Sequence, residues 1–292
     1  METLDDLTPE TLRNLYLEQR LTETEIAKRF DTTQVSICRR RKKWGIETLG
    51  KTGRITAALP PLMEPQEALL YGSLLGDGGM RPINAKSARF SEGHSLTQEN
   101  YLLWKAGILE SYVRLISPTK KTDKRSGKIF HGKALYTFAT THLRPLYEKF
   151  YPAPDRQRIF PADLPQRMTP FILAIWYMDD GSVMKEFHPR ITFGLDDVSL
   201  ERALSALRVL GFEPTVHRGE KASDRTITFP DQDRKFYDMI TPHVPECMAY
   251  KIPEFSLRRV KDENAKKLTI EEAVRRQAMG RPRKDHRILD RG

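Results

Sequence analysis

Two segments of this chain share one pattern, an apolar run of about two helical turns that ends in an Asp-Gly pair. The first segment, Leu70–Gly78, reads LYGSLLGDG, and the second, Leu173–Gly181, reads LAIWYMDDG. Their final acids, Asp77 and Asp180, lie 103 positions apart. One Asp-Gly pair alone is an ordinary helix end or turn. Two copies predict a duplicated fold in which a carboxylate ends each of two equivalent helices.

The position of these acids indicates a cation. A carboxylate in the last turn of a helix faces the negative end of the macrodipole, which disfavours the charge. A divalent metal removes that penalty. Gly72 and Gly76 lie four positions apart on one helix face, where they permit close approach of a second helix. Ile175 and Asp179 occupy the matching positions of the second segment, so the expected interface is asymmetric.

The charge balance favours a polyanionic partner. The 292 residues include 49 Lys and Arg against 39 Asp and Glu, a net charge of +10. Nucleic acid is the simplest such partner. Cys38 and Cys247 are the only cysteines and form no CxxC pair, which argues against a zinc site or disulfide framework. Without a signal peptide or a membrane-length apolar run, a cytoplasmic or organellar matrix protein is expected.

Residues 1–46 are predicted to form a separate all-α module. Its expected helices are Thr11–Arg20, Glu23–Phe30 and Gln34–Trp44, and Thr22 with Glu25 forms a capping box before the second. Helix, tight turn and helix at this spacing resemble a helix-turn-helix DNA-binding unit. The alternative is a packing module with a solvated basic face. The residues expected to contact DNA are Thr33, Gln34, Ser36, Arg39 and Arg40.

The rest of the chain divides into a linker, two halves and a tail. Gly and Pro residues in 47–64 indicate a linker, and the halves are expected at 65–165 and 166–258. Both halves contain Tyr-x-x-apolar-x-Pro, beginning at Tyr147 and Tyr237. The first half is longer by 13 residues between its Asp and this Tyr, and Lys120–Lys133 is expected to supply that length as a hairpin. The tail, 259–292, is polar and basic, and its Gly280-Arg281-Pro282 is similar to the core of a minor-groove hook.

Between motif and tyrosine, each half alternates strand-like and helical patterns. The pattern alone indicates an α+β fold with antiparallel sheets. The expected strands are Ala88–Ser95, Ala134–Ala139, Arg190–Leu195, Phe212–Arg218 and Arg225–Phe229, and the expected helices are Asn100–Val113 and Ser199–Leu210.

The two Asp-Gly segments resemble the signature of the LAGLIDADG homing endonucleases. The first matches the variant that ends Leu-Gly-Asp-Gly, and the second matches Trp-Phe-Met-Asp-Asp-Gly with Tyr177 in place of Phe. Two motifs in one chain resemble the monomeric branch, over roughly residues 65–258. The resemblance implies a pseudo-two-fold duplicated αββαββα domain with antiparallel DNA-binding sheets, preceded here by the small all-α module.

The resemblance also implies the site. Asp77 and Asp180 are the expected metal ligands, with Gly76 and Asp179 as additional contacts. Two carboxylates suit Mg²⁺, which keeps water and phosphate among its ligands, and Mn²⁺ is the expected substitute. Lys251 matches the lysine that stands beside the metal site in relatives with Tyr-Lys-Leu-Pro.

Arg158 takes the place of that lysine in the first half. Arginine keeps its proton near neutral pH, so it is expected to stabilise charge or order water. The strand and hairpin residues expected to contact DNA are Arg81, Lys86, Arg89, Lys120, Lys121, Lys124, Arg125, Lys128, Lys133, Arg190, Arg218 and Arg225.

The sequence therefore predicts a monomeric, metal-dependent, site-specific double-strand DNA endonuclease without a membrane partner. Two alternatives use the same scaffold. The first is an RNA maturase that binds intron RNA and assists splicing. The second is a non-catalytic DNA-binding regulator, although both motif acids are present.

Overall fold

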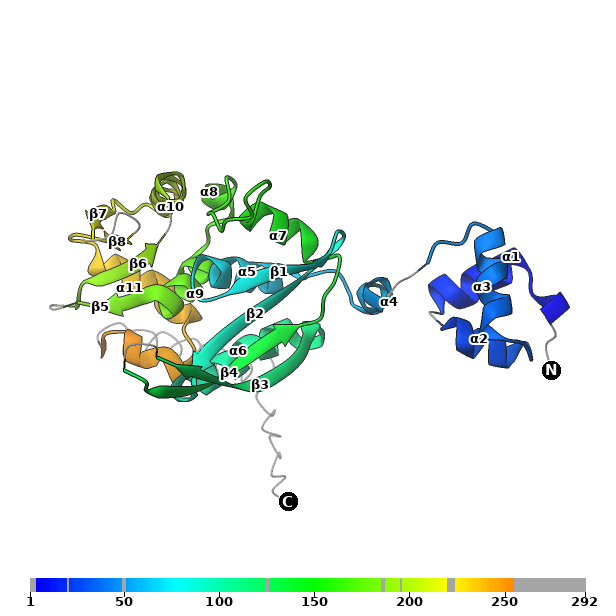
Figure 1. Cartoon of the computed structure of the whole chain (residues 1–292). Helices are drawn as coiled ribbons and strands as arrows, with labels where there is room; N and C mark the ends of the chain where they lie inside the picture. Colours follow the sequence, from blue (N-terminus) through cyan, green and yellow to red (C-terminus); the bar gives the residue numbers. More distant parts are fainter. Residues whose placement is uncertain are drawn as a thin grey trace, which may run out of the picture. The chain divides into compact units, whose positions relative to one another are not determined.

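The computed structural model describes residues 4–19, 21–48, 51–123, 126–184, 187–194, 196–219 and 224–254 (Figure 1). The expectations for Lys124, Arg125 and the tail 259–292 concern residues outside these ranges. No helix in the described ranges is long and apolar enough to cross a membrane. The chain divides into two compact units, Met1–Leu70 with Gly78–Arg158, and Tyr71–Asp77 with Ile159–Gly292.

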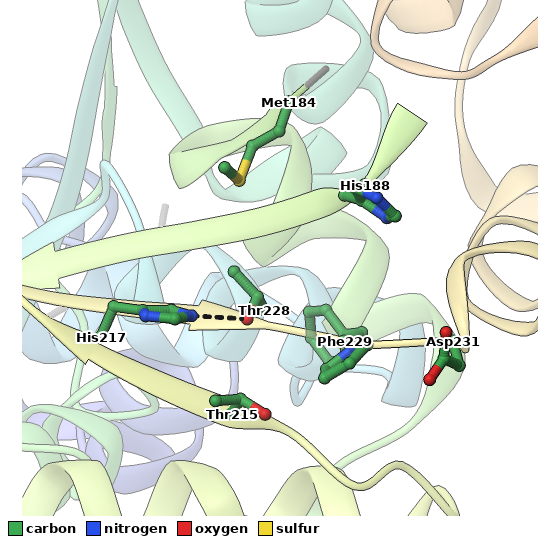
Figure 2. Close-up of a pocket in the computed structure, with 8 residues that line it drawn as sticks. Met184, His188, Thr215, His217, Thr228, Phe229 and Asp231 are labelled. Carbon is green, nitrogen blue, oxygen red and sulfur yellow. Dashed lines mark hydrogen bonds between the residues drawn. The ribbon is translucent and has the colours of Figure 1, made fainter. Parts of the chain in front are cut away.

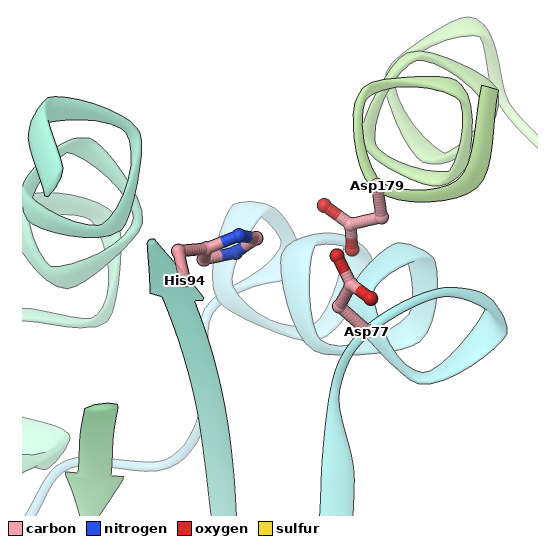
Figure 3. A group of neighbouring side chains, drawn as sticks. All are labelled: Asp77, His94 and Asp179. Carbon is pink, nitrogen blue, oxygen red and sulfur yellow. The ribbon is translucent and has the colours of Figure 1, made fainter. Parts of the chain in front are cut away.

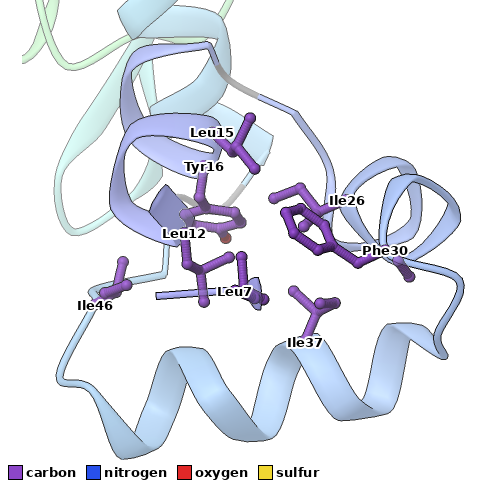
Figure 4. Close-up of a cluster of buried hydrophobic side chains, with 9 residues drawn as sticks. Leu7, Leu12, Leu15, Tyr16, Ile26, Phe30, Ile37 and Ile46 are labelled. Atoms are coloured by element: carbon purple, nitrogen blue, oxygen red, sulfur yellow. The ribbon is translucent and has the colours of Figure 1, made fainter. Parts of the chain in front are cut away.

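The first unit begins with the expected helical module. Its helices are α1 (Pro9–Arg13), a π-helical turn (Asn14–Glu18), α2 (Glu23–Arg29) and α3 (Gln34–Lys43). The capping box is confirmed, because the Thr22 amide donates to the Glu25 carboxylate at 2.6 Å and the Glu25 amide donates to the Thr22 hydroxyl at 3.1 Å. Figure 4 shows the core, in which Tyr16, Phe30 and Ile37 lie among aliphatic side chains.

The expected linker contains a helix, α4 (Lys51–Ala58). It is also tied to the rest of the first unit. The Thr141 amide donates to Thr56 Oγ1 at 2.9 Å, and the Tyr112 hydroxyl donates to the Pro60 carbonyl at 2.6 Å. The expected linker therefore contains an ordered helix, and Gly53 lies within it.

Both halves have the αββαββα order. The elements of the first half are α5 (Glu64–Leu75), β1 (Gly79–Asn84), β2 (Ser87–Ser95), α6 (Glu99–Leu109), β3 (Val113–Thr122), β4 (Ile129–Thr137) and α7 (Arg144–Phe150). Those of the second half are α9 (Pro170–Asp180), β5 (Gly181–Val183), β6 (Pro189–Gly194), α10 (Asp197–Val209), β7 (Thr215–Arg218), β8 (Asp224–Thr228) and α11 (Asp233–Ile240), preceded by the short α8 (Leu164–Arg167).

Each half has one antiparallel four-stranded sheet, with the orders β1-β2-β4-β3 and β5-β6-β8-β7. The α+β prediction is thus confirmed. The expected hairpin is confirmed as well, because Lys120 lies opposite His131 and Thr122 opposite Ile129. Strands β3 and β4 have ten and nine residues against four and five for β7 and β8, which accounts for extra length in the first half.

The inner face of the first sheet contains a buried charged cluster. Glu92 on β2 accepts hydrogen bonds from His94 Nε2 at 2.6 Å and from Lys105 Nζ of α6 at 2.5 Å. Tyr101 lies under the ammonium, with its ring centre 4.5 Å away. Although burial opposes ionisation, Lys105 and His94 lower the pKa of Glu92 to about 2. The inner face of β6 in the other half presents apolar residues, Ile191 and Phe193.

This cluster predicts a stability defect for Lys105→Met. The substitution leaves a buried carboxylate without its cation, which costs about 3–5 kcal/mol of unfolding free energy. Lys133→Met is the matched control, because the Lys133–Glu99 pair is about one-third exposed. That pair is expected to contribute under about 1 kcal/mol. Denaturant unfolding of both variants measures the difference, and equal losses would contradict the assignment.

The cluster also predicts acid sensitivity. The pKa of Glu92 falls from an ordinary 4.5 to about 2 in the folded chain, so its stabilising effect is complete above pH 4.5. The effect disappears as the pH falls from 4.5 towards 2. Unfolding free energies measured across this window should decline more steeply for the wild type than for Glu92→Gln. Parallel curves would show that Glu92 is not the responsible group.

Candidate functional site

Both repeated segments are helical over their apolar runs. The helix α9 ends on Asp180, while α5 ends two residues before Asp77. Thr169 caps the start of α9 by accepting the Ile172 amide at 3.2 Å. Every residue from Ile172 to Met178 is buried, whereas Asp77 is exposed. The carboxylates therefore appear where the apolar runs stop.

Glycine permits the close contact between the two motif helices. A Cβ at Gly72 would lie 2.6 Å from Ile175 Cβ, and a Cβ at Gly76 would lie 2.4 Å from Asp179 Cβ. Both distances are far below van der Waals contact, so no other residue fits without movement. The close approach expected at Gly72 and Gly76 is present, and the residues that they meet are Ile175 and Asp179.

The crossing brings two carboxylates together. Carboxylate oxygens of Asp77 and Asp179 lie within 4.8 Å of each other, each at the end of a motif helix (Figure 3). Asp180 is half-buried and is not part of this pair. Two oxygen donors at negative helix ends suit a hard divalent cation rather than a soft one. The pair therefore has donor chemistry that fits Mg²⁺ or Mn²⁺.

Lys251 contacts the end of α9. Its ammonium donates to the carbonyl of Met178 at 2.5 Å, to that of Gly181 at 2.9 Å and to that of Asp179 at 3.5 Å. These carbonyls belong to the last helical turn and to the residue after it, where helix carbonyls lack intrahelical partners. A positive charge there also interacts favourably with the negative end of the helix macrodipole. Lys251 thus lies at the end of the helix that carries Asp179 and Asp180.

Arg158 makes the corresponding contact in the first half. Its guanidinium donates to the Gly78 carbonyl at 3.3 Å. Gly78 and Gly181 are the glycines of the two Asp-Gly pairs, so both basic residues contact equivalent carbonyls. The contact is nevertheless weaker for Arg158, because this bond is longer than those of Lys251 to Met178 and Gly181.

The outer face of the first sheet contains two of the expected DNA contacts. Arg81 and Arg89 lie directly opposite each other on β1 and β2, and the Arg89 guanidinium lies 5.2 Å from the Tyr136 ring centre. Like charges at facing positions destabilise a sheet. A bound anion relieves that repulsion. Lys86 lies in the turn between these strands, and Lys120, Lys121 and Lys128 are exposed on the β3–β4 hairpin.

Three expected DNA contacts, Arg225, Lys133 and Arg218, lie at strand positions on the helix-covered side of their sheets instead. Arg225 is only 5% exposed, because its guanidinium pairs with Asp197 of α10 at 2.7 Å. Lys133 pairs with Glu99 of α6. Basic residues on a strand alternate between faces, and the sequence does not establish the register. Burial and the ion pair with Asp197 contradict DNA contact by Arg225, while DNA contact by Lys133 stays a prediction.

The outer face of the second sheet is hollowed. Figure 2 shows a pocket of about 460 Å³ that Thr215, His217 and Thr228 line from β7 and β8. His217 Nε2 and Thr228 Oγ1 are 3.2 Å apart. Arg190 lies opposite Thr228 on β6 and is exposed. Arg218 on β7 is exposed as well, but it lies directly opposite Arg225, and its guanidinium is 3.7 Å from Asp197. Sequence reasoning missed this pocket, because its lining includes few charged residues.

Of the five module residues expected to contact DNA, Thr33, Gln34 and Arg39 are exposed and the other two, Ser36 and Arg40, are half-buried. The Thr33 hydroxyl caps α3 and lies 3.0 Å from that of Ser36, and the Gln34 amide donates to Glu23 at 2.7 Å. Arg39 is exposed, and Arg40 lies over the Trp44 ring. Val35 is 54% exposed, one turn before Arg39. The expected set omitted Val35, although an exposed apolar residue on a basic helix was a readable signal.

Comparison with known proteins agrees with this architecture. The model of the LAGLIDADG DNA endonuclease family matches residues 67–236. "Protein RecA" of Mycobacterium gastri is 28% identical over 72% of this chain and 52% of its own length. DNA endonuclease I-ChuI of Chlamydomonas applanata is 26% identical over 66% of this chain and 96% of its own length. The structure of homing endonuclease I-WcaI bound to its DNA recognition sequence has a TM-score of 0.61 at 18% identity, covering 73% of this chain and 97% of that one.

The chain belongs to the LAGLIDADG DNA endonuclease family, because the family model covers more than half of its residues. Both motif segments fall within that match. The chain spans about half the length of the first curated relatives that it matches. The structural likeness to I-WcaI supports the shared fold.

The helix crossing predicts that Gly72→Ala destabilises the second unit. The added Cβ overlaps Ile175, and overpacking of this kind costs about 1–3 kcal/mol. The second substitution Ile175→Ala should recover part of the loss. Gly93→Ala is the control, since a Cβ there meets its nearest atom at an ordinary 3.6 Å. Thermal unfolding of these three variants measures the difference, and a Gly72→Ala protein as stable as the wild type would contradict the close helix contact.

Proposed function

We propose that this chain is a site-specific endonuclease that hydrolyses both strands of double-stranded DNA with a divalent metal. The observation that carries the proposal is the approach of Asp77 to Asp179 at a helix crossing that only glycine permits. Family membership supports the reaction class. Two of the three relatives named above, I-ChuI and I-WcaI, are described as endonucleases, and the I-WcaI structure contains its DNA recognition sequence.

In this proposal, the motif acids hold the metal, and Lys251 and Arg158 stabilise charge beside it. Asp77, Asp179 and Asp180 supply carboxylate oxygens that would hold Mg²⁺, or Mn²⁺ in its place, and the Gly76 carbonyl is a further proposed contact. When bound, the metal supplies charge stabilisation and an activated water. Lys251 holds positive charge beside the acids and orders water or phosphate oxygens there. Arg158 stabilises charge in the equivalent place of the first half, without exchanging a proton.

The sheets supply the DNA contacts. Arg81 and Arg190 are exposed on the strands and Arg89 is half-buried, and a phosphate backbone relieves the repulsion between Arg81 and Arg89. Arg218, which lies beside Asp197, is a further proposed contact. Lys86 and the hairpin lysines add to this basic surface. Phosphate contacts position the protein, while base contacts in the grooves carry the sequence information. Because one chain contains both motifs, we propose that it acts as a monomer.

We also propose that the N-terminal module is a second DNA contact of helix-turn-helix type. Three basic residues in the last turn of α3, Arg40, Lys42 and Lys43, and the absence of acidic residues from the helix support it, whereas Arg41 is buried and paired with Glu23. Arg39 suits a guanine edge, and the exposed methyl groups of Val35 suit a thymine methyl. Thr33 and Ser36 contribute by holding the start of α3, and Gln34 is held by Glu23.

The acids give the direct test of cleavage. Asp77→Asn, Asp179→Asn and Asp180→Asn should each abolish double-strand cutting, because each removes a metal-holding charge, while DNA affinity changes less than about two-fold. The assay is linearisation, with Mg²⁺, of pooled plasmids that carry genomic fragments of the source organism. The exposed Asp155→Asn is the control. DNA binding by the wild type without cleavage of any plasmid would favour the regulator or the maturase.

The N-terminal module has its own test. A chain that begins at Lys51, and so keeps α4, should still cut its site but bind more weakly and protect fewer base pairs. The full-length variant Arg39→Ala should lower the slope of binding against log salt by about 0.9 for each phosphate that this arginine neutralises. Val35→Ala should instead change base preference at one position. Equal affinity and an equal footprint across a salt series would remove the module from the DNA interface.

A further inference from the structure

The helix α9 holds Lys251 at both ends of the residue. At the side-chain end, the ammonium donates to the carbonyls of Met178 and Gly181. At the backbone end, the Lys251 carbonyl accepts a hydrogen bond from the Tyr177 hydroxyl at 3.1 Å. Tyr177 belongs to the second motif itself, so one short stretch of α9 fixes both the position and the direction of this lysine.

The direction of the hydroxyl network is defined. The hydroxyl oxygens of Tyr177 and Tyr237 lie 3.3 Å apart. A phenol has one proton to donate. The Tyr177 proton goes to the Lys251 carbonyl, so Tyr237 donates to Tyr177. Burial raises the pKa of Tyr177 to about 12, and a hydrogen bond from Tyr237 opposes that rise. Tyr177 therefore stays a neutral donor at any ordinary assay pH.

The Tyr177 ring has little freedom to move. It is fully buried and meets the Phe236 ring edge to face at 5.1 Å. A Cβ at Gly181 would lie 2.1 Å from a ring carbon of Tyr177, so the glycine of the Asp-Gly pair leaves just enough space for the ring. The hydroxyl is consequently presented to Lys251 by rigid packing on two sides.

The first motif has no hydroxyl that corresponds to that of Tyr177. Leu74 occupies the motif position that corresponds to Tyr177. Arg158, the counterpart of Lys251, donates to the Gly78 carbonyl at 3.3 Å. The hydroxyl also departs from the motif variant that this segment resembles, where Phe stands. A phenylalanine would fill the same apolar space, so packing alone does not require the oxygen.

We propose that Tyr177 is a positioning residue whose hydroxyl fixes the Lys251 backbone and so holds the Lys251 ammonium beside the motif acids. The inference rests on the proposed function of Lys251. It assigns a preorganised lysine to the second half. Tyr177 touches neither DNA nor metal in this role and acts through Lys251 alone.

The first test is strand-resolved, single-turnover cleavage by Tyr177→Phe. Loss of one hydrogen bond should slow cutting about three- to ten-fold, on the strand that Lys251→Ala also slows, with DNA affinity unchanged. The Tyr177→Phe/Lys251→Ala double variant should be no slower than Lys251→Ala, because the hydroxyl acts only through the lysine. A simple loss of stability would instead multiply the two effects and slow both strands.

Tyr112→Phe is the matched control. It removes another buried hydroxyl that donates to a backbone carbonyl, that of Pro60, in the other unit. Its melting temperature should fall about as far as that of Tyr177→Phe, without a change in cleavage rate. Hydrogen exchange supplies a readout that needs no DNA target. Amides of residues 246–252 should exchange faster in Tyr177→Phe and not in Tyr112→Phe.

Three results would count against the inference, and they differ in whether they also reject the proposed function of Lys251. A slow Lys251→Ala with a normal Tyr177→Phe rejects the positioning role and leaves the proposed function intact. A normal Lys251→Ala removes Lys251 from the proposed function as well. Unchanged hydrogen exchange at 246–252 would also count against Tyr177, whatever the cleavage rates.

Discussion

The contact between the two motif helices is the constraint on which the site depends. Gly72 and Gly76 have no side chain to separate α5 from Ile175 and Asp179 of α9. Without that spacing, the carboxylates at the helix ends would not come within 4.8 Å of each other. Mutual repulsion of two acids at negative helix ends opposes this arrangement, and apolar burial along α9 supports it. Folding thus concentrates negative charge at a point where the helices have no freedom to separate it.

Basic groups offset that charge unequally. Lys251 makes three contacts with carbonyls at the end of α9, whereas Arg158 donates to the Gly78 carbonyl. The cores differ as well. The first half buries the Glu92–Lys105 pair beneath its sheet, and the second presents Ile191 there. Burying a charge pair is seldom more stabilising than apolar packing. Duplication has therefore preserved the topology while the interiors diverged.

The sequence was sufficient for features that depend on local pattern. The capping box at Thr22, the helix ends at the motifs and the close approach at Gly72 and Gly76 follow from residue type and spacing. Features that depend on the register of paired strands could not be predicted from the sequence. Arg225 and Arg190 both belong to strands with alternating exposure, and only the pairing of β6 with β8 shows that Arg225 turns inward to Asp197. Strand β5 and helix α8 are too short to give a periodic signal.

The unequal hairpins have a consequence for the shape of a target. Strands β3 and β4 extend for ten and nine residues, while β7 and β8 stop at four and five. If DNA lies along the outer faces of both sheets, one arm reaches further from the cut than the other. A palindrome would then offer the short arm base pairs that it has no side chains to read. Under the proposed function, the recognition sequence of such a protein would therefore have a direction.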